Sequence, residues 1–349
     1  MLYPIIFKPI YKEVIWGGME IFPFKGIPVD SEKIGESWEI SHVEQHLSVV
    51  ANGFLEGKTI DEIINEYGAQ LLGTKVISQT GNTFPLLIKF IDACDNLSVQ
   101  VHPDDDMALE RHNSPGKTEI WYVVKATPDA LLYCGFSQQT DIEEYKRRVE
   151  ENSIMDIIKK YHIKEGDVFF LPAGSVHAIG MGCFILEIQQ TSDITYRIYD
   201  YNRKDFNGYE RELHTELAKD AINYNYSFDY KKEYSHVENG STELVHCQYF
   251  TTNLLNLNKP TKRILTEIDS FIVYVCIKGK TTLTDNKGNI ITIHQGQTVL
   301  IPADTENITI TPEVIHKNNP AKNDHITVDT KNSFIEPNNE CKLVEAYVK

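Results

Sequence analysis

The stretch Gly166-Asp-Val-Phe-Phe-Leu-Pro172-Ala-Gly-Ser-Val-His177 has a counterpart near the other end of the chain, Gly296-Gln-Thr-Val-Leu-Ile-Pro302-Ala-Asp-Thr-Glu-Asn307. Each copy is a glycine, a mainly apolar five-residue segment, the pair Pro-Ala and a polar turn. Such a segment between Gly and Pro is typical of a β-strand bounded by turns. A weaker pair, Tyr122-Val-Val-Lys125 and Tyr274-Val-Cys-Ile-Lys278, precedes the two copies. The similarity predicts two copies of one β-unit, with chance as the alternative because Gly-strand-Pro is common in β proteins.

Most of the remaining sequence also predicts short strands. Segments rich in Val, Ile, Tyr, Phe and Thr cover 84–91, 120–125, 167–171, 184–189, 271–277 and 298–301. The turn 285–289 between two strand-like segments is typical of a hairpin. Helical spacing or capping residues predict helices from Thr59 to Leu71, at 141–161 and at 210–221. We therefore expect a mainly β fold of two sandwiches or barrels with a few inserted helices.

Composition narrows the class of protein. The 349 residues have a formal net charge of −16, which argues against a nucleic-acid partner, because phosphate contacts need a basic face. No apolar segment approaches the ~20 residues of a membrane span, and the N-terminus is not typical of a signal peptide, so we expect no membrane partner. The six cysteines are scattered without a Cys-x-x-Cys pair. This pattern favours reduced thiols in a cytoplasmic protein.

One group of residues predicts a metal site. In Leu97-Ser-Val-Gln100-Val-His102, the alternation of a strand places Gln100 and His102 on one face. Lys117 and Glu119 form a second same-face pair, and His177 follows a third strand. Two imidazoles, a carboxylate and an amide oxygen are suitable ligands for a divalent ion with an open position. In the second copy, Asn307 stands where the first has His177, so we expect the second unit to be structural.

Several stretches of the first part resemble the type I mannose-6-phosphate isomerases in their short bacterial form, which belong to the cupin superfamily. They are Ile15-Trp-Gly-Gly18, Gly35-Glu-Ser-Trp-Glu39, Leu87-Ile-Lys-Phe90, Leu97-Ser-Val-Gln-Val-His-Pro-Asp104, Gly116-Lys-Thr-Glu119, Leu171-Pro-Ala-Gly-Ser-Val-His-Ala178 and Glu187-Ile-Gln-Gln-Thr-Ser-Asp-Ile-Thr-Tyr-Arg197. The similarity extends to about residue 220. Beyond residue 240 it is architectural only.

The resemblance implies two cupin-like (jelly-roll) units: a metal-binding catalytic domain over 1–235 and a degenerate, metal-free cupin domain over 236–349. It implies one Zn²⁺ ion on Gln100, His102, Glu119 and His177. The implied substrate is a small sugar phosphate, with mannose 6-phosphate and fructose 6-phosphate interconverted by proton transfer through an enediol(ate). The chain lacks the large helical domain of longer relatives, and it has Ile194 where bacterial members usually have Thr.

The resemblance further implies an active-site arginine at Arg197, with Lys117 and Asp193 in the same pocket. Lys89 and Arg203 are candidates for holding the phosphate group. Glu187 and Asp193 are candidate catalytic carboxylates, since burial and nearby cations can tune their pKa values. Asp193 has a second interpretation, a salt bridge that orients Arg197, and the proton-transfer base stays open.

Two alternative functions stay open from the sequence. Another metal-dependent cupin enzyme acting on sugars is one alternative, because the ligand types do not exclude iron. A non-catalytic sugar-binding protein with two cupin units is the other. Ser114-Pro-Gly-Lys-Thr118 resembles the end of a phosphate-binding loop, but Arg111 stands where its first glycine is required. The sequence does not predict an oligomeric state.

Overall fold

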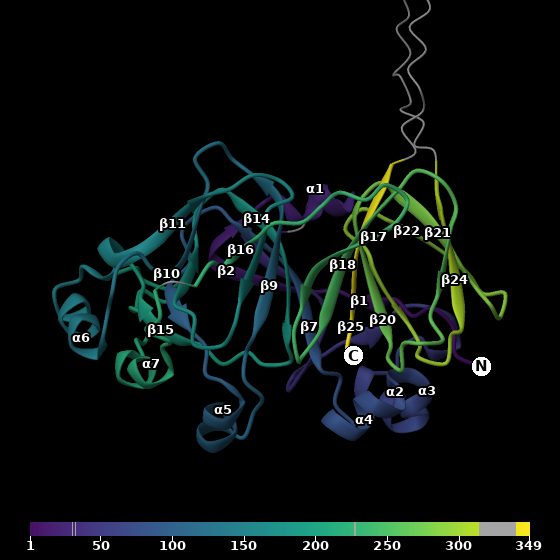
Figure 1. Ribbon diagram of the computed structural model, residues 1–349, viewed down its shortest axis with the longest axis horizontal. Coiled ribbons are helices and arrows are strands. Elements are labelled where there is room, and N and C mark those ends of the chain that lie inside the picture. Colours follow the sequence, from purple (N-terminus) through teal and green to yellow (C-terminus); the bar gives the residue numbers. More distant parts are fainter. Residues whose placement is uncertain (30, 32, 227, 314–339) are drawn as a thin grey trace, which may run out of the picture.

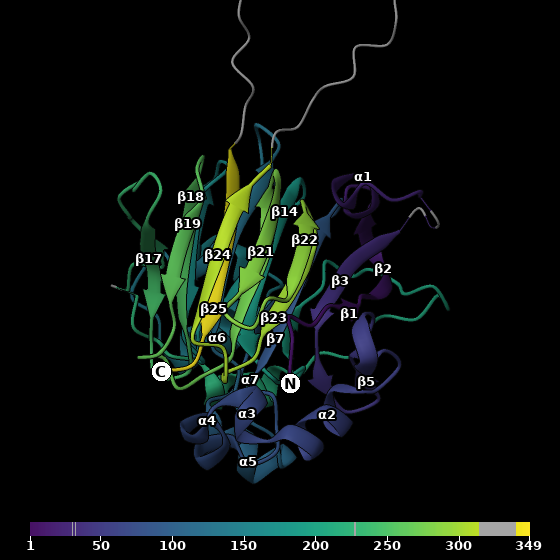
Figure 2. The ribbon, with the colours of Figure 1, turned by 90° about the vertical axis from the view of Figure 1, so that its right-hand side faces the viewer.

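The computed structural model describes residues 1–29, 31, 33–226, 228–313 and 340–349. Two antiparallel β-sandwiches lie side by side, with the helices at their ends and edges (Figure 1, Figure 2). The predicted mainly β fold is confirmed. Among the described residues, every helix is too short or too polar to reach across a bilayer.

The N-terminal sandwich has a seven-stranded and a five-stranded sheet. The larger sheet has the order β16 (Lys231–Lys232), β12 (Val168–Leu171), β9 (Glu119–Ala126), β14 (Cys183–Gln190), β7 (Leu86–Ala93), β2 (Ile10–Gly18) and β3 (Ile34–Ile40). The smaller has the order β11 (Ile158–His162), β10 (Leu131–Phe136), β13 (His177–Ile179), β8 (Val99–Val101) and β15 (Tyr196–Tyr199). Both sheets contribute residues to the predicted metal site.

The C-terminal sandwich repeats this plan with fewer strands. One sheet has the order β17 (Ser241–His246), β18 (Thr251–Leu257), β25 (Cys341–Tyr347), β20 (Ile272–Lys278) and β23 (Thr298–Ile301). The facing sheet has the order β19 (Thr261–Ile264), β24 (Asn307–Pro312), β21 (Lys280–Asp285) and β22 (Ile290–His294). The predicted hairpin joins β21 to β22, with Gly288 in the left-handed conformation that such a turn requires.

One of the buried hydrophobic clusters joins the two sandwiches, and each sandwich also has clusters of its own. Phe90 and Leu186 of the larger N-terminal sheet belong to the same buried cluster as Val273 and Val344 of the C-terminal sandwich. The chain passes from one sandwich to the other between β16 and β17, around the predicted boundary at residue 235. Because one cluster crosses between the sandwiches, a division into independently folding domains stays a prediction.

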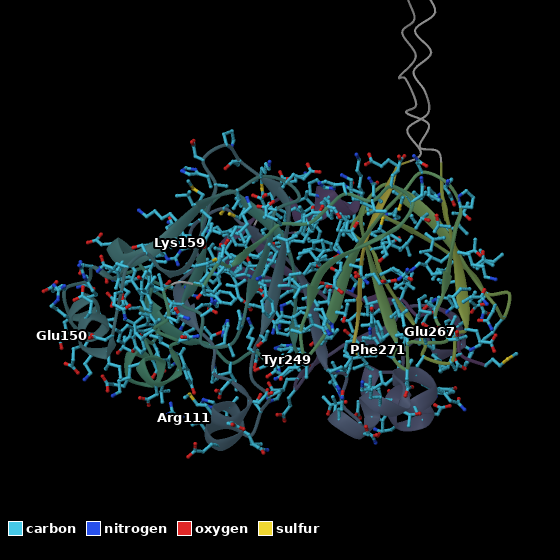
Figure 3. All side chains as sticks on the ribbon, in the orientation of Figure 1. Arg111, Glu150, Lys159, Tyr249, Glu267 and Phe271 are labelled. Atoms are coloured by element: carbon cyan, nitrogen blue, oxygen red, sulfur yellow. The ribbon has the colours of Figure 1, made fainter. Side chains whose placement is uncertain are left out.

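Seven helices and four short strands complete the described residues. The helices are α1 (Ile21–Lys25), α2 (Ile60–Tyr67), α3 (Ala69–Leu72), α4 (Thr74–Thr80), α5 (Asp105–His112), α6 (Ile142–Glu150) and α7 (Thr215–Ala221), with 3₁₀ turns η1 (Gly53–Leu55) and η2 (Ile154–Ile157). The short strands pair β1 (Phe7–Lys8) with β6 (Val49–Val50) and β4 (His42–Val43) with β5 (His46–Leu47). Phe271, labelled in Figure 3, contacts the ring of Phe84, and its amide donates to the carbonyl of Leu72 at the end of α3.

The predicted helices are confirmed in place but not in length. Thr59 and Glu62 form the capping box that begins α2. The second helix begins at Ile142, one residue later than predicted, because Asp141 is its N-cap. Its predicted end at 161 is wrong, because 158–162 forms an edge strand paired with β10. The third helix covers only the last part of 210–221.

The register of the strands shows which residues of the two copies of the internal repeat correspond. Phe169 and Val299 hold the same place in the two Gly-x5-Pro stretches, and they pair with Trp121 and Tyr274. The counterpart of Tyr274 is therefore Trp121 and not Tyr122, one residue from the alignment suggested by sequence.

Candidate metal centre

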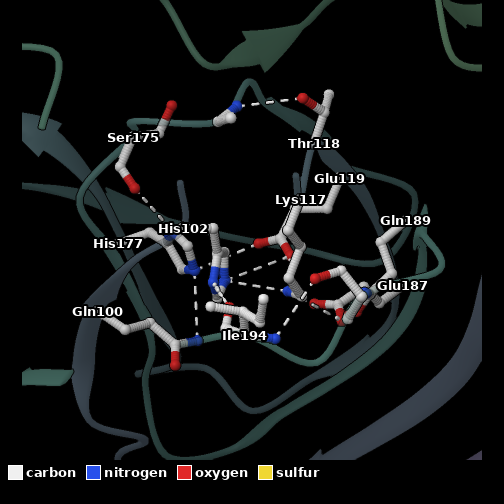
Figure 4. Close-up of polar contacts among 12 residues, drawn as sticks. Gln100, His102, Lys117, Thr118, Glu119, Ser175, His177, Glu187, Gln189 and Ile194 are labelled. Atoms are coloured by element: carbon white, nitrogen blue, oxygen red, sulfur yellow. Dashed lines mark hydrogen bonds and ion pairs between the residues drawn. The ribbon is translucent and has the colours of Figure 1, made fainter. Parts of the chain in front are cut away.

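Three predicted ligands meet inside the N-terminal sandwich. His102 follows β8, Glu119 begins β9 and His177 begins β13, so the two facing sheets bring them together. One ligand atom of each lies within 4.8 Å of the others, and all three side chains are buried (Figure 4). Gln100 lies beside them, with its amide nitrogen 3.3 Å from His177 Nε2. A half-turn of the amide about its last bond puts its oxygen there instead.

Backbone carbonyls fix both imidazoles in the orientation that metal binding requires. His102 Nδ1 lies 2.8 Å from the carbonyl oxygen of Ile194, and His177 Nδ1 lies 2.8 Å from that of Ser175. Each Nδ1–H therefore donates to a carbonyl, and each Nε2 keeps a lone pair directed at the cluster.

The cluster has an excess of lone pairs. His177 Nε2 faces Glu119 Oε1 at 3.2 Å, and this buried oxygen accepts no hydrogen bond in the described part of the chain. Burial, with Lys117 adding to the effect, lowers the pKa of His177 to about 3 and that of His102 well below its usual range, so both rings are neutral. Two lone pairs at this distance repel each other unless a cation lies between them. The donor set therefore fits a divalent metal ion.

Buried charges surround the ligands. Burial and the carboxylate of Glu187 raise the pKa of Glu119 to about 7, although Lys117 opposes the shift. Burial also acts to raise the pKa of Glu187, but Lys117 and Lys89 outweigh it and hold the value at about 2. Lys117 contacts Glu119 and lies 3.0 Å from His102 Nε2, while Lys89 lies 2.9 Å from Glu187 Oε1. Trp121 Nε1 donates to the second oxygen of Glu187 at 2.6 Å.

A cavity of about 200 Å³ opens beside the cluster. Its walls include six predicted site residues: Lys89, Gln100, Lys117, Glu187, Asp193 and Arg197. The structure therefore places one candidate metal ligand, Gln100, together with cations and carboxylates around one space. This arrangement can hold an anionic substrate next to a metal ion.

Arg197 lines this space and has one unsatisfied donor. Its Nη1 donates to the carbonyl of Glu212 at 2.9 Å, but its buried Nε has no hydrogen-bond partner among the described residues. Burial and the cations of Arg211 and Arg203 lower its pKa, which marks a locally positive site. Within the described residues, Arg197 makes no ion pair with Asp193, so the interpretation of Asp193 as its salt-bridge partner finds no support.

Arg203 lies elsewhere. It is not in the cavity wall, and its guanidinium binds Asp200 at 2.7 Å and Asp95 at 3.1 Å. Arg211, which also binds Asp200, lines the cavity instead and was missed by the sequence analysis. No motif distinguishes Arg211 from Arg203, because both come from the irregular segment between β15 and α7.

Glu36, Trp16 and Trp38 also line the cavity. All three lie in stretches that carry the family resemblance, and this resemblance is the signal that could have identified them as site residues. Lys89 lies between Glu187 and Glu36, whose Oε2 is 3.7 Å from its ammonium group. Glu36 therefore takes part in the same charge cluster.

The comparisons with known proteins agree with this geometry. The family model for the catalytic domain of type I phosphomannose isomerase matches residues 5–122, and that for the cupin domain of mannose-6-phosphate isomerase matches residues 240–315. The mannose-6-phosphate isomerase ManA of Bacillus subtilis is 35% identical over 302 residues, which cover 86% of this chain and 93% of that protein. The chain belongs to the type I mannose-6-phosphate isomerase family.

Further relatives support the assignment to this family. The probable mannose-6-phosphate isomerase GmuF of Bacillus subtilis is 41% identical over 223 residues, 64% of this chain and 69% of that protein. The crystal structure of the mannose 6-phosphate isomerase from Bacillus subtilis has a TM-score of 0.82 at 29% identity, covering 99% of this chain and 100% of that chain. The predicted family and its isomerase activity are thus confirmed.

Proposed function

We propose that this chain interconverts mannose 6-phosphate and fructose 6-phosphate in the cavity beside His102, Glu119 and His177. The observation that carries the proposal is the buried cluster of two neutral imidazoles and one unpartnered carboxylate oxygen, next to a cavity lined by Lys89, Lys117 and Arg197. Family membership supplies the reaction. The local cations supply the positive field that a chain of net charge −16 needs for an anionic substrate.

The proposed ion is one Zn²⁺ held by Gln100, His102, Glu119 and His177, an N/O ligand set that suits zinc. When bound, zinc supplies Lewis-acid polarisation on the side of the two reacting sugar oxygens. Its identity is a proposal, because imidazole, amide and carboxylate ligands also accept iron.

Three cationic residues of the chain are assigned to binding the substrate and its developing charge. Arg197, which lines the cavity with its planar fork of donors, binds an anionic oxygen of the substrate. Lys117 lies between the metal ligands and Glu187 and faces the charge that develops on the enediolate. Lys89 adds positive charge from the other side of Glu187.

The two carboxylates differ in their surroundings. Glu187 is held by Lys89, Lys117 and Trp121, and its depressed pKa makes it a poor proton acceptor, so we assign it to positioning the two lysines. Asp193 lines the same cavity, is exposed to it, and makes no ion pair among the described residues. We propose that Asp193 carries the proton between C1 and C2.

Two further parts of the proposal concern the rest of the chain. Ile272 stands where the repeat places Glu119, which supports a metal-free C-terminal unit over 236–349 beside a catalytic unit over 1–235. The six cysteines are free thiols, which supports the cytoplasmic location expected from the sequence.

His102→Ala tests the proposal most simply. We expect the variant to lose the metal and the conversion of mannose 6-phosphate together, because His102 supplies one of the two imidazole nitrogens of the cluster. His162→Ala, an exposed histidine on the edge strand β11, is the control and should keep both. Full activity of His102→Ala with unchanged metal content would refute the site.

A further inference from the structure

The cations in the wall of the cavity beside the metal ligands differ in how far carboxylates compensate them. The described part of the wall contains two lysines and two arginines. Lys89 lies 2.9 Å from the buried Glu187, and Lys117 contacts the buried Glu119. Each lysine therefore has a carboxylate as a close partner. The two arginines are the cations that remain to bind an anion.

Arg211, one of these arginines, shares a buried carboxylate with a neighbour outside the wall. Its Nε donates to Asp200 Oδ2 at 2.7 Å and its Nη2 to Asp200 Oδ1 at 2.5 Å. Arg203 Nη2 donates to the same Oδ1 at 2.7 Å, and its Nη1 donates to the exposed Asp95 at 3.1 Å. Together with Arg197, which makes no ion pair among the described residues, three guanidinium groups thus face two carboxylates. This end of the cavity has an excess of positive charge.

Asp200 orients Arg211 and leaves part of its guanidinium free. The carboxylate engages Nε and Nη2, whereas Nη1 makes no hydrogen bond in the described part of the chain. A guanidinium that is already held along one edge loses little further freedom when it binds an anion with its remaining donors. The side chain of Arg211 is 23% exposed, and Arg211 lines the cavity, whereas Arg203 does not.

The backbone holds the segment of Arg211 beside Arg197. Arg197 Nη1 donates to the carbonyl of Glu212 at 2.9 Å, and the amide of His214 donates to the carbonyl of Arg197 at 2.7 Å. Both hydrogen bonds join β15 to the segment that carries Arg211. Two neighbouring guanidinium groups repel each other, and an anion between them relieves this repulsion. A phosphate group, with about two negative charges and three acceptor oxygens, suits such a pair.

We propose that Arg211, oriented by Asp200, binds the phosphate group of the sugar phosphate. The inference rests on the proposed isomerase function and deepens it, because it assigns a specificity-determining residue and a positioning residue to the same cavity. Among the described residues, Arg211 makes no hydrogen bond or ion pair with a candidate metal ligand. It therefore contributes to binding of the substrate and not to the reaction at C1 and C2.

Arg211→Ala separates binding from turnover. We expect the KM for mannose 6-phosphate to rise about tenfold or more, with kcat and metal content unchanged, because the phosphate contact is the same before and during the reaction. Titration calorimetry with sorbitol 6-phosphate should show the same loss of affinity. This probe has no carbonyl group and cannot be isomerised, so it reports binding without turnover.

Arg203→Ala is the matched control. It removes the other guanidinium on Asp200 without changing the cavity wall, so its KM and its affinity for sorbitol 6-phosphate should stay close to those of the original protein. The same variant tests the interpretation from sequence, which favoured Arg203 for the phosphate. An equal or larger loss in Arg203→Ala than in Arg211→Ala would overturn the proposal.

Asp200→Asn tests the positioning role. We expect its KM to rise in the same direction as that of Arg211→Ala. The double variant should be no worse than Arg211→Ala alone, because Asp200 acts through Arg211. Additive effects of the two changes would show that Asp200 does not act in this way.

The outcome for Arg211→Ala decides the main claim. Unchanged KM and unchanged affinity for sorbitol 6-phosphate would overturn it, and so would a fall in kcat together with loss of metal. Failure of the isomerase function has a different signature, because the original protein would then not convert mannose 6-phosphate at all. The calorimetric comparison still decides the role of Arg211 in that case.

Discussion

The two sandwiches carry the same buried carboxylate and use it differently. Glu187 on β14 pairs with Trp121 on one side and Lys89 on the other, and Glu345 on β25 pairs in the same way with Tyr274 and Asn253. In both halves the aromatic residue donates a hydrogen bond to the glutamate. The repeat thus preserves a charged residue in the middle of a sheet.

What surrounds the two glutamates differs. Glu345 accepts from Asn253 at 2.7 Å, Tyr274 at 2.9 Å and Arg263 at 2.8 Å, and this satisfies the carboxylate completely. Near Glu187, the facing sheet contributes histidines, and a second carboxylate has an unpartnered oxygen. The comparison teaches that the fold supplies a buried carboxylate in both halves. The neighbouring side chains decide whether it is satisfied within its own sandwich, like Glu345, or belongs to a cluster with unpartnered groups, like Glu187.

The largest expected effect comes from making the first half like the second at one position. Glu119→Ile copies Ile272, its counterpart in the C-terminal sandwich. We expect this variant to fold but to lose the metal and at least about 10³-fold in turnover, because both a ligand and its charge are removed. Metal analysis and a coupled assay for fructose 6-phosphate check this. A metal-bound, active Glu119→Ile would contradict the comparison.

Arg197→Ala should have the next largest effect. Arg197 lines the cavity, and its guanidinium makes no hydrogen bond or ion pair with a candidate metal ligand among the described residues, so we expect unchanged metal content and a loss of about 10²-fold in kcat/KM. The control is Arg147→Ala on the exposed helix α6, which should behave like the original protein. A matching loss of metal from Arg197→Ala would show that the arginine is structural.

The position of Glu345 allows a stability test of the other half. Glu345→Gln leaves Arg263 without its buried partner, and we expect it to lower the free energy of unfolding by about 3 kcal/mol. Turnover at 25 °C should not change. Denaturant unfolding and the isomerase assay measure the two effects, and a loss of turnover in the folded variant would mean that the C-terminal carboxylate acts on the reaction.

The smallest expected effect concerns how the free energy of unfolding depends on pH, to which a residue of the first half contributes and its counterpart in the second half does not. Burial raises the pKa of Asp92 on β7 to about 6, whereas the strand register places the uncharged Asn256 at the matching position of β18. Asp92 binds a proton more readily in the folded state, so its contribution favours folding at about pH 4 and is lost as the pH rises through about 6.

In the original protein, we expect Asp92 to lower the free energy of unfolding by about 2 kcal/mol as the pH rises from about 4 to about 6. Asp92→Asn should abolish this loss. Comparing the variant with the original protein cancels the titration of the histidines. An identical pH profile for the two proteins would show that Asp92 has an ordinary pKa.

The sequence predicted the parts of this structure that follow from local patterns. The Gly-x5-Pro repeat located β12 and β23, and alternation along β8 placed Gln100 and His102 on one face. The helix prediction failed at 158–162, where residues that follow a helix form a strand because they pair with β10. Tertiary contacts decided that outcome, and no local signal records them.

The same limit applies to the site. The convergence of Gln100, His102, Glu119 and His177 was predictable because strand spacing and family motifs both point to these positions. Arg203 and Arg211 lie in an irregular segment, so sequence could not tell which one reaches the cavity. The carboxylate shared by the two halves was also hidden, because the strand register is needed to align Glu187 with Glu345.

The most direct test of the central claim is to measure bound metal and isomerase activity together while a chelator removes the ion from the purified protein. We predict one divalent ion per chain, with activity falling in proportion to the metal lost and returning when zinc is added back. A metal-free preparation that converts mannose 6-phosphate at the full rate would contradict the account.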